Sequence, residues 1–368
     1  MTRQNPGFPG FFHALTAVLT YPWITSAGPA DLFGGHQPVI DNPCFVMRLI
    51  SSLFWNRRQQ RLRCLWRVLI QGVGFVSIVI VLVMPMFMVL AALGSSGESE
   101  FALITAGTLH AVVLTVTLLT AWVLLDRRRL SELGVNLWSR RWLIEFVAGG
   151  LLGSSLMVGI FAIEYALGWI EIRRIAASGD LSGSSLGMHQ LGWLVLMLMV
   201  GFSEEMFSRG YHLKNFSEGF RRFGVWQSTA LAGLLSSAIF GLLHAFNPGA
   251  TVLSTALVMM AGMMFAVGRV TTGSLAAPIG LHFTWNLFQG PILGFPVSGN
   301  QLQSSLVAIE QLGDPFWTGG EFGPESGLLG VLAMLIVIGV FLAWPKQHSV
   351  QRNVARLARY RRRKSQFR

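Results

Sequence analysis

Long apolar stretches recur along the chain and are separated by short polar or basic segments. A helix of roughly 20 apolar residues crosses the hydrocarbon core of a bilayer, which is about 30 Å thick. The pattern therefore predicts an all-α polytopic membrane protein with about eight transmembrane helices. The expected spans are 68–93, 101–125, 143–168, 189–213, 226–246, 251–268, 274–296 and 327–344.

The composition agrees with this pattern. Of the 368 residues, 52% are apolar and only 12% are charged, which is about half the charged share of an ordinary soluble domain. This balance excludes a disordered chain, a disulfide-rich secreted scaffold and an ordinary soluble enzyme. The two cysteines, Cys44 and Cys64, lack the spacing of a disulfide framework or a thiolate metal site.

The positions of the basic residues predict the orientation of the chain. Its net charge is +11, and 26 of its 28 lysines and arginines lie before the first span, around the ends of even-numbered spans, or in the C-terminal tail. Only Arg173 and Arg174 fall on the other side, where the segment 297–326 carries acidic residues and no basic one. Cytoplasmic segments hold the excess of lysine and arginine. We therefore predict a multi-pass integral membrane protein with both termini in the cytoplasm.

The same pattern divides the chain into three parts. Residues 1–67 are expected to be a cytoplasmic segment, 68–346 the transmembrane domain, and 347–368 a basic cytoplasmic tail that contacts anionic lipid headgroups. Within the first part, 52–67 alternates large apolar side chains with arginines, which is typical of an interfacial helix and equally of the positive flank of a first span. The expected partners are the lipid bilayer and a membrane-associated peptide or protein. Nucleic acid is not expected, because no aromatic platform accompanies the basic residues.

Ionisable side chains within a span cost about 2.5–3.5 kcal/mol at the helix centre on insertion scales, so each is a candidate for function. Glu145 and Glu164 lie near the ends of their span and are interpreted as structural, as is His110, a lone polar residue. The Gly149-x-x-x-Gly153 pair in the same span as these glutamates predicts close helix packing. The remaining candidates have an ordered spacing on three spans and are Glu204, Glu205, Arg209, His244, His282 and Asn286.

The spacing of the first three candidates predicts different roles for the two glutamates. Glu205 and Arg209 are four residues apart, in the favourable order for an ion pair on one helix face. Glu204 points about 100° away from Glu205 on an ideal helix and is left without a local cation. An unpaired carboxylate in an apolar site is a candidate general base.

The other candidates come from two further spans. His282 and Asn286 are four residues apart and share a helix face, whereas His244 ends its span. Two imidazoles, a free carboxylate and an amide can activate a water molecule and stabilise an oxyanion. The alternative is a buried polar network that only fixes helix packing. With ideal helices, His244 falls near the outer end of its span while the others fall deeper, so the depth of the site stays open.

Three motifs in order resemble the CPBP (Abi) family of intramembrane proteases, which includes the type II CAAX prenyl endopeptidases. The motifs are Glu204-Glu205-Met206-Phe207-Ser208-Arg209, Phe240-Gly241-Leu242-Leu243-His244 and His282-Phe283-Thr284-Trp285-Asn286. The resemblance covers about 143–296. It implies an eight-helix fold with its active site inside the membrane, and hydrolysis of a peptide bond in a substrate that is membrane-associated or prenylated (CAAX-type).

The resemblance also implies a role for each motif residue. Glu204 and His244 would activate the water, His282 and Asn286 would hold the oxyanion, and Glu205 with Arg209 would be structural. The residues favour a mechanism without a cofactor. The alternative is a catalytic zinc, which takes three protein ligands, here Glu204, His244 and His282.

Two other functions compete with an endopeptidase. One is a non-proteolytic, peptide-binding membrane scaffold or bacteriocin-immunity-type protein, which the intact set of motif residues disfavours. The other is a transporter that uses the same groups as a proton relay. Transporters of that kind are often built from two related halves, and the sequence has no such repeat.

Overall fold

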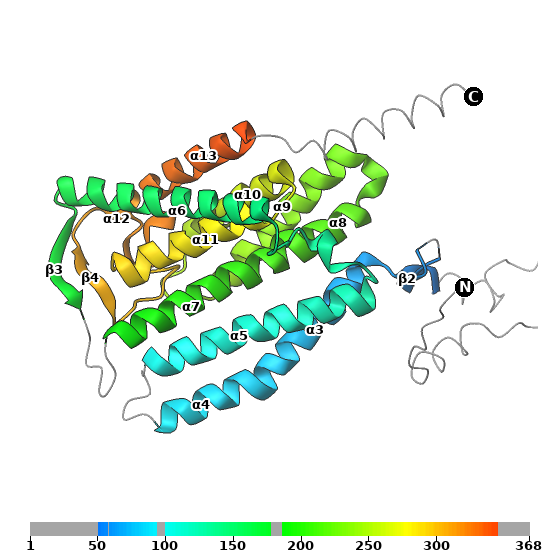
Figure 1. Ribbon diagram of the computed structural model, residues 1–368, viewed down its shortest axis with the longest axis horizontal. Helices are drawn as coiled ribbons and strands as arrows, with labels where there is room; N and C mark the ends of the chain where they lie inside the picture. The colour runs from blue at the N-terminus through cyan, green and yellow to red at the C-terminus, as the bar shows by residue number, and fades with distance from the viewer. Residues whose placement is uncertain (1–50, 58, 94–99, 178–185, 345–368) are drawn as a thin grey trace, which may run out of the picture. The chain divides into compact units, whose positions relative to one another are not determined.

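The computed structural model describes residues 51–57, 59–93, 100–177 and 186–344 (Figure 1). The predicted cytoplasmic segment up to residue 50 and the predicted lipid-binding tail lie outside the described residues. The protein is an all-α integral membrane protein, and its helices form where the apolar stretches predict them, because a helix satisfies its own backbone polar groups in lipid. These helices are α3 Cys64–Ile78, α4 Met84–Leu93, α5 Glu100–Thr120, α6 Arg140–Ala166, α7 Leu186–Glu205, α8 Leu213–Gly219, α9 Val225–His244, α10 Val252–Thr272, α11 Ala276–Leu287 and α13 Leu328–Ala343.

Several of these helices join into longer rods through π-helical segments. Val79–Val83 joins α3 to α4, Ala121–Leu125 extends α5, and Met206–His212 joins α7 to α8. Within the described residues, six helical stretches are long and apolar enough to cross a membrane. The predicted count of eight is therefore not confirmed, because α11 and α13 are shorter. They have 12 and 16 residues.

Helix α11 is short because it lies inside the helix bundle and not across its outer surface. It packs chiefly against α6 and α7, and most of its side chains are buried. The predicted Gly149/Gly153 contact forms here: a Cβ atom added to Gly153 would lie 2.6 Å from the backbone oxygen of Leu281. The Thr284 hydroxyl also donates to the backbone carbonyl of Gly150 at 2.7 Å. Helix α6 thus fixes the depth and rotation of the helix that carries His282.

A two-stranded antiparallel ribbon joins two segments that the sequence pattern predicts as loops. Strand β3, Ile170–Ala177, pairs with β4, Ser305–Gln311, with an irregularity between Ile172 and Arg174. Figure 1 shows the ribbon beside the N-terminus of α7. Since paired strands must lie on the same side of a membrane, the segment after α6 and the segment before α13 share a side, as the charge distribution predicts.

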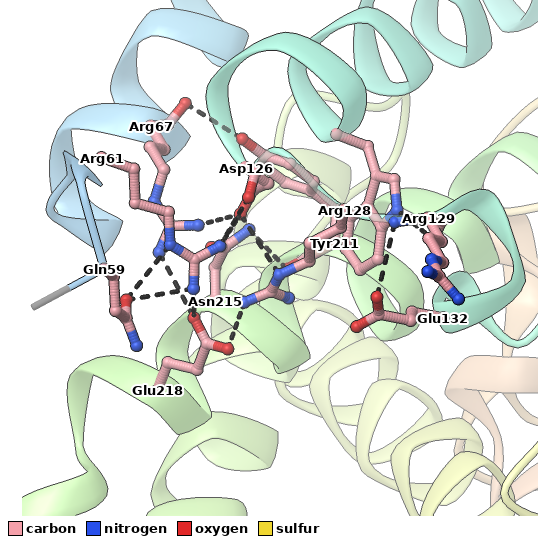
Figure 2. Close-up of polar contacts among 11 residues, drawn as sticks. Gln59, Arg61, Arg67, Asp126, Arg128, Arg129, Glu132, Tyr211, Asn215 and Glu218 are labelled. Carbon is pink, nitrogen blue, oxygen red and sulfur yellow. Dashed lines mark hydrogen bonds and ion pairs between the residues drawn. The ribbon is translucent and has the colours of Figure 1, made fainter. Parts of the chain in front are cut away.

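A group of charged side chains at the opposite ends of the helices forms what we call the ion cluster (Figure 2). It joins the segment before α3, the segment after α5 and the end of α8. An Arg61 Nη lies 2.9 Å from the Glu218 carboxylate, and Arg67 and Arg128 pair closely with Asp126 and Glu218, respectively. The cluster members are Arg61, Arg67, Asp126, Arg128 and Glu218. Three of the segments predicted to be cytoplasmic therefore meet, although their orientation in a cell remains a prediction.

The region 52–67 is not a continuous interfacial helix. It contains strands β1, Trp55–Asn56, and β2, Arg61–Leu62, which pair with each other before α3 begins at Cys64. Arg61 and Arg67, two of the arginines in this region, turn inward to the carboxylates of the ion cluster. Pairing with Glu218 and Asp126 compensates these guanidinium groups for the water that they lose on turning inward.

Candidate active site

The first motif lies where α7 changes into the π-helical segment Met206–His212. Glu204 and Glu205 are the last residues of α7, and Arg209 lies inside the wider turn. π-Helical turns are rare and are frequent at functional sites, because the extra residue re-aims the side chains around it. Here the π-helical turn directly follows the two adjacent glutamates.

The ion pair expected from the four-residue spacing is present and fully buried. An Arg209 Nη donates to Oε1 of Glu205 at 2.8 Å, and the other Nη donates to the backbone carbonyl of Gly262 at 3.0 Å. The guanidinium lies between the rings of Phe240 and Phe265, 4.3 and 5.0 Å from their centroids. One arginine thus ties α7 to α9 and α10 around the site.

His282 on α11 contacts both glutamates. Its Nδ1 lies 3.1 Å from Oε1 of Glu205, whereas its Nε2 lies 3.8 Å from Oε2 of Glu204. The ring stacks on Phe265 with a centroid separation of 4.9 Å. Because a carboxylate only accepts, the short contact assigns a proton to Nδ1 and turns Nε2 toward Glu204. Glu205 therefore orients the histidine, a contact that helix geometry within α7 does not reveal.

The two glutamates differ in their surroundings as the sequence predicts. The Glu205 side chain is fully buried and the Glu204 side chain is 28% exposed. Oε2 of Glu204 is buried and has no hydrogen-bond partner in the described part of the chain. Glu204 therefore presents one carboxylate oxygen toward His282 and keeps some access to its surroundings, which suits a group that must exchange a proton.

Asn286 and His244 lie close to this pair without contacting it directly. Asn286 is one turn beyond His282 on α11 and is half-buried. The His244 ring lies 4.7 Å from the Phe240 ring, which lies 6.2 Å from the His282 ring. Phe240, one turn before His244, therefore brings the last turns of α9 beside His282. Nδ1 of His244 lies 2.8 Å from the backbone carbonyl of Phe240.

The donors do not gather into a metal site. Among the described residues, no group of three or more histidine, cysteine, aspartate or glutamate side chains is placed to hold a metal ion. The zinc ligands considered from the sequence were Glu204, His244 and His282. The first and last approach each other, whereas the ring contact described for His244 is with Phe240 and not with Glu204 or His282. As arranged, this set does not fit a zinc ion.

The remaining ionisable residues of the spans have packing partners. Glu145 is buried and accepts from Nε of Arg141 at 2.8 Å, and Glu164 is buried and accepts from Gln311 at 3.3 Å. Both contacts fit the structural interpretation, although the two carboxylates lie within the protein and not at its lipid interface. His110 packs edge-on against Phe75, with 5.0 Å between the ring centroids.

Comparison with known proteins gives one match. The family model described as "Type II CAAX prenyl endopeptidase Rce1-like" matches residues 188–288. No curated protein and no solved structure matches the chain. All six motif residues fall inside the matched region, which is narrower than the stretch 143–296 expected from the motifs. The resemblance to the CPBP and CAAX protease group, inferred from the motifs, is confirmed by this match.

Proposed function

We propose that this protein is an intramembrane endopeptidase that hydrolyses a peptide bond of a membrane-associated substrate, with prenylated CAAX-type proteins as the substrate class. The observation that supports it best is the unpaired Glu204 carboxylate beside His282, whose other nitrogen contacts Glu205. This arrangement lies within the region matched by a CAAX endopeptidase family. An unpaired carboxylate inside a membrane protein is energetically costly, so its presence there indicates a functional role.

In the proposed reaction, Glu204 takes a proton from a water molecule as that water attacks the scissile carbonyl carbon. His244 assists from the end of α9 by orienting the same water. The proton then passes from Glu204 to the departing amine nitrogen, so that water is added across the C–N bond. General acid–base catalysis of this kind contributes about 10²- to 10⁴-fold to the rate.

His282 and Asn286 are assigned to the oxyanion that forms on the attacked carbonyl oxygen. The Asn286 amide is one turn from His282 and makes no hydrogen bond with the described residues, so its N–H groups are available to a substrate. His282 donates from Nε2 when it carries both protons, while Nδ1 stays on Glu205. Losing one such donor costs about 10²- to 10³-fold in kcat.

The experiment that tests this function is cleavage of a panel of membrane-tethered peptides, with and without a prenyl group, by the purified protein in vesicles. The proposal expects cleavage by the parent and a kcat lower by about 10²- to 10⁴-fold in Glu204→Gln. Asn286→Ala should retain about one part in 10² to 10³ of kcat, and Asn247→Ala, a partly exposed amide bound to Ser298, serves as its control. Binding of the peptides without cleavage would favour the scaffold function instead.

A chelator separates the glutamate mechanism from the zinc alternative. A water activated by Glu204 alone needs no metal, so chelation followed by gel filtration should leave kcat unchanged. Loss of activity on chelation, with recovery on adding zinc, would contradict the metal-independent mechanism. The control is Glu204→Gln, which should stay inactive with and without zinc.

A further inference from the structure

Arg269 in the last turn of α10 is a cation without a counter-ion among the described residues. Its Nε is buried and has no hydrogen-bond partner in the part of the chain that the structure describes. The residue as a whole is half-buried, so its Nη groups retain access to the outside. Burying an unpaired charge costs several kcal/mol. No ion pair among the described residues compensates the charge of Arg269.

Gly134 provides the surface against which this guanidinium lies. A Cβ atom at Gly134 would be 3.0 Å from Cζ and Nη2 of Arg269 and 3.3 Å from Nε. Gly134 has a φ of +89°, which glycine adopts without strain, and its carbonyl accepts from the backbone N–H of Leu275 at 3.0 Å. A missing side chain thus leaves room for a flat guanidinium against an anchored turn.

Lys214 lies on α8, which packs against α10 close to Arg269. Leu213 and Ala266 belong to one buried cluster between α8 and α10, and Arg269 lies about one turn beyond Ala266. Lys214 is exposed, makes no hydrogen bond or ion pair with the described residues, and interacts electrostatically with Arg269 and Arg128. The carboxylates near Lys214 are Glu132 and Glu218, the latter a member of the ion cluster.

Two exposed tryptophans lie on segments next to those of the two cations, one after the Gly134 turn and one on α9, which packs against α8. Trp138, four residues after Gly134, is 98% exposed, and Trp226 at the start of α9 is 74% exposed. Exposed tryptophans gather at the headgroup level of a bilayer. The anion that is abundant at that depth is the phosphate of a lipid, and arginine binds phosphate through paired N–H groups.

From these observations we infer that Arg269 and Lys214, together with the Gly134 turn, bind the phosphate group of a bilayer lipid with an anionic headgroup. Basic pockets between transmembrane helices commonly hold such headgroups. This site lies apart from Glu204 and its inference does not depend on peptidase activity. The lipid supplies the counter-charge that the described residues do not.

The test is thermal unfolding of the purified full chain in a neutral detergent, with added phosphatidylglycerol, phosphatidylcholine or inorganic phosphate. Phosphatidylglycerol should raise the Tm of the parent by about 3 °C or more above the value in phosphatidylcholine. Arg269→Gln should lose most of this increase, and Lys214→Gln should bind the lipid at least about fivefold more weakly. Arg222→Gln, an exposed arginine that stacks on Phe223, should behave as the parent.

The lipid-free arm distinguishes a ligand site from a structural arginine. Without lipid, Arg269→Gln should melt at the parent's Tm or above it, because the change removes an uncompensated charge. A lower Tm without lipid, combined with an undiminished response to phosphatidylglycerol, would overturn the inference. So would a response to inorganic phosphate alone. If Arg269→Gln does not fold, the exposed Lys214→Gln carries the same comparison.

Discussion

The chain holds two groups of charged side chains that are built in opposite ways. In the ion cluster, three arginines share two carboxylates, and each carboxylate has more than one arginine within 4 Å (Figure 2). Around α7, two carboxylates face one arginine and one histidine, and Arg209 pairs with Glu205 alone. The first group is compensated throughout, whereas the second leaves Glu204 without an arginine partner, which is the feature on which the proposed peptidase function rests.

Glu204→Gln gives the largest effect that this comparison predicts. The amide keeps the shape of the side chain but cannot take a proton, so kcat should fall about 10²- to 10⁴-fold while the Tm in detergent stays near that of the parent. Both quantities are measured on the same purified sample. Glu145→Gln, which changes a carboxylate paired with Arg141, is the control for activity. Parent-level activity in Glu204→Gln would end the assignment of this residue as the base.

Breaking the buried Arg209–Glu205 pair should mainly affect stability. Arg209→Met leaves Glu205 without its cation inside the protein, which typically costs about 3–5 kcal/mol. The double variant Arg209→Met with Glu205→Gln should recover part of that loss, since no isolated charge remains. Denaturation in detergent of Arg209→Met, Glu205→Gln and the double variant gives the coupling free energy of the pair as a double-mutant cycle. Single variants as stable as the parent would show that the pair adds nothing to the fold.

Glu325 provides a third kind of buried carboxylate, one held by hydrogen bonds with no cation paired to it among those residues of 51–344 that the structure describes. The backbone N–H and hydroxyl of Ser298 donate to Oε1 at 2.6 and 2.9 Å, and Gln289 donates to Oε2. Burial raises the pKa of Glu325 to about 7 against these hydrogen bonds. Because the folded-state pKa lies above the unfolded one, this group contributes most stability below about pH 4.5, and the contribution is lost as the pH rises through about 7.

The expected result is a decrease in unfolding free energy of up to about 3 kcal/mol between pH 4 and 8 in the parent. Glu325→Gln should remove that part of the pH dependence, which is read from Tm against pH. The exposed Glu310→Gln, on the β3–β4 ribbon, controls for general charge effects. An identical pH profile in Glu325→Gln would mean that folding does not raise the pKa of Glu325.

Glu218→Gln in the ion cluster should have the smallest effect. Its side chain is 16% exposed and Asp126 still faces the same arginines, so the loss should be about 1–2 kcal/mol. Peptidase activity should change less than about twofold, because the cluster and Glu204 are independent sites. A loss of activity comparable to that of Glu204→Gln would show that the two groups are coupled, which would break the comparison.

The sequence predicts the helices well because lipid leaves the backbone few alternatives. It also predicts the Arg209–Glu205 pair, since four residues on one helix determine that contact. It misses the contact between Glu205 and His282, which are 77 residues apart, because nothing local specifies how α11 is rotated. The β3–β4 ribbon is missed for the same reason: Ile170-Glu171-Ile172-Arg173 alternates as a strand does, but nothing local specifies its partner β4. The contact of Phe240 on α9 with His282 on α11 likewise depends on packing between helices that are distant in the sequence.

The ribbon also has a consequence for how the chain is made. Ala177 of β3 pairs with Ser305 of β4, so β3 leaves the ribosome long before its partner strand is made. Synthesis at about 5–20 residues per second makes the interval between these two residues roughly 6–26 s. During it, α7 and α9 to α11 enter the bilayer with both carboxylates of the first motif already present and the ribbon still open. Closing the ribbon is therefore a late, post-insertion step. Chains that stop before residue 305 should reach the membrane without it and be preferred substrates for quality-control proteases.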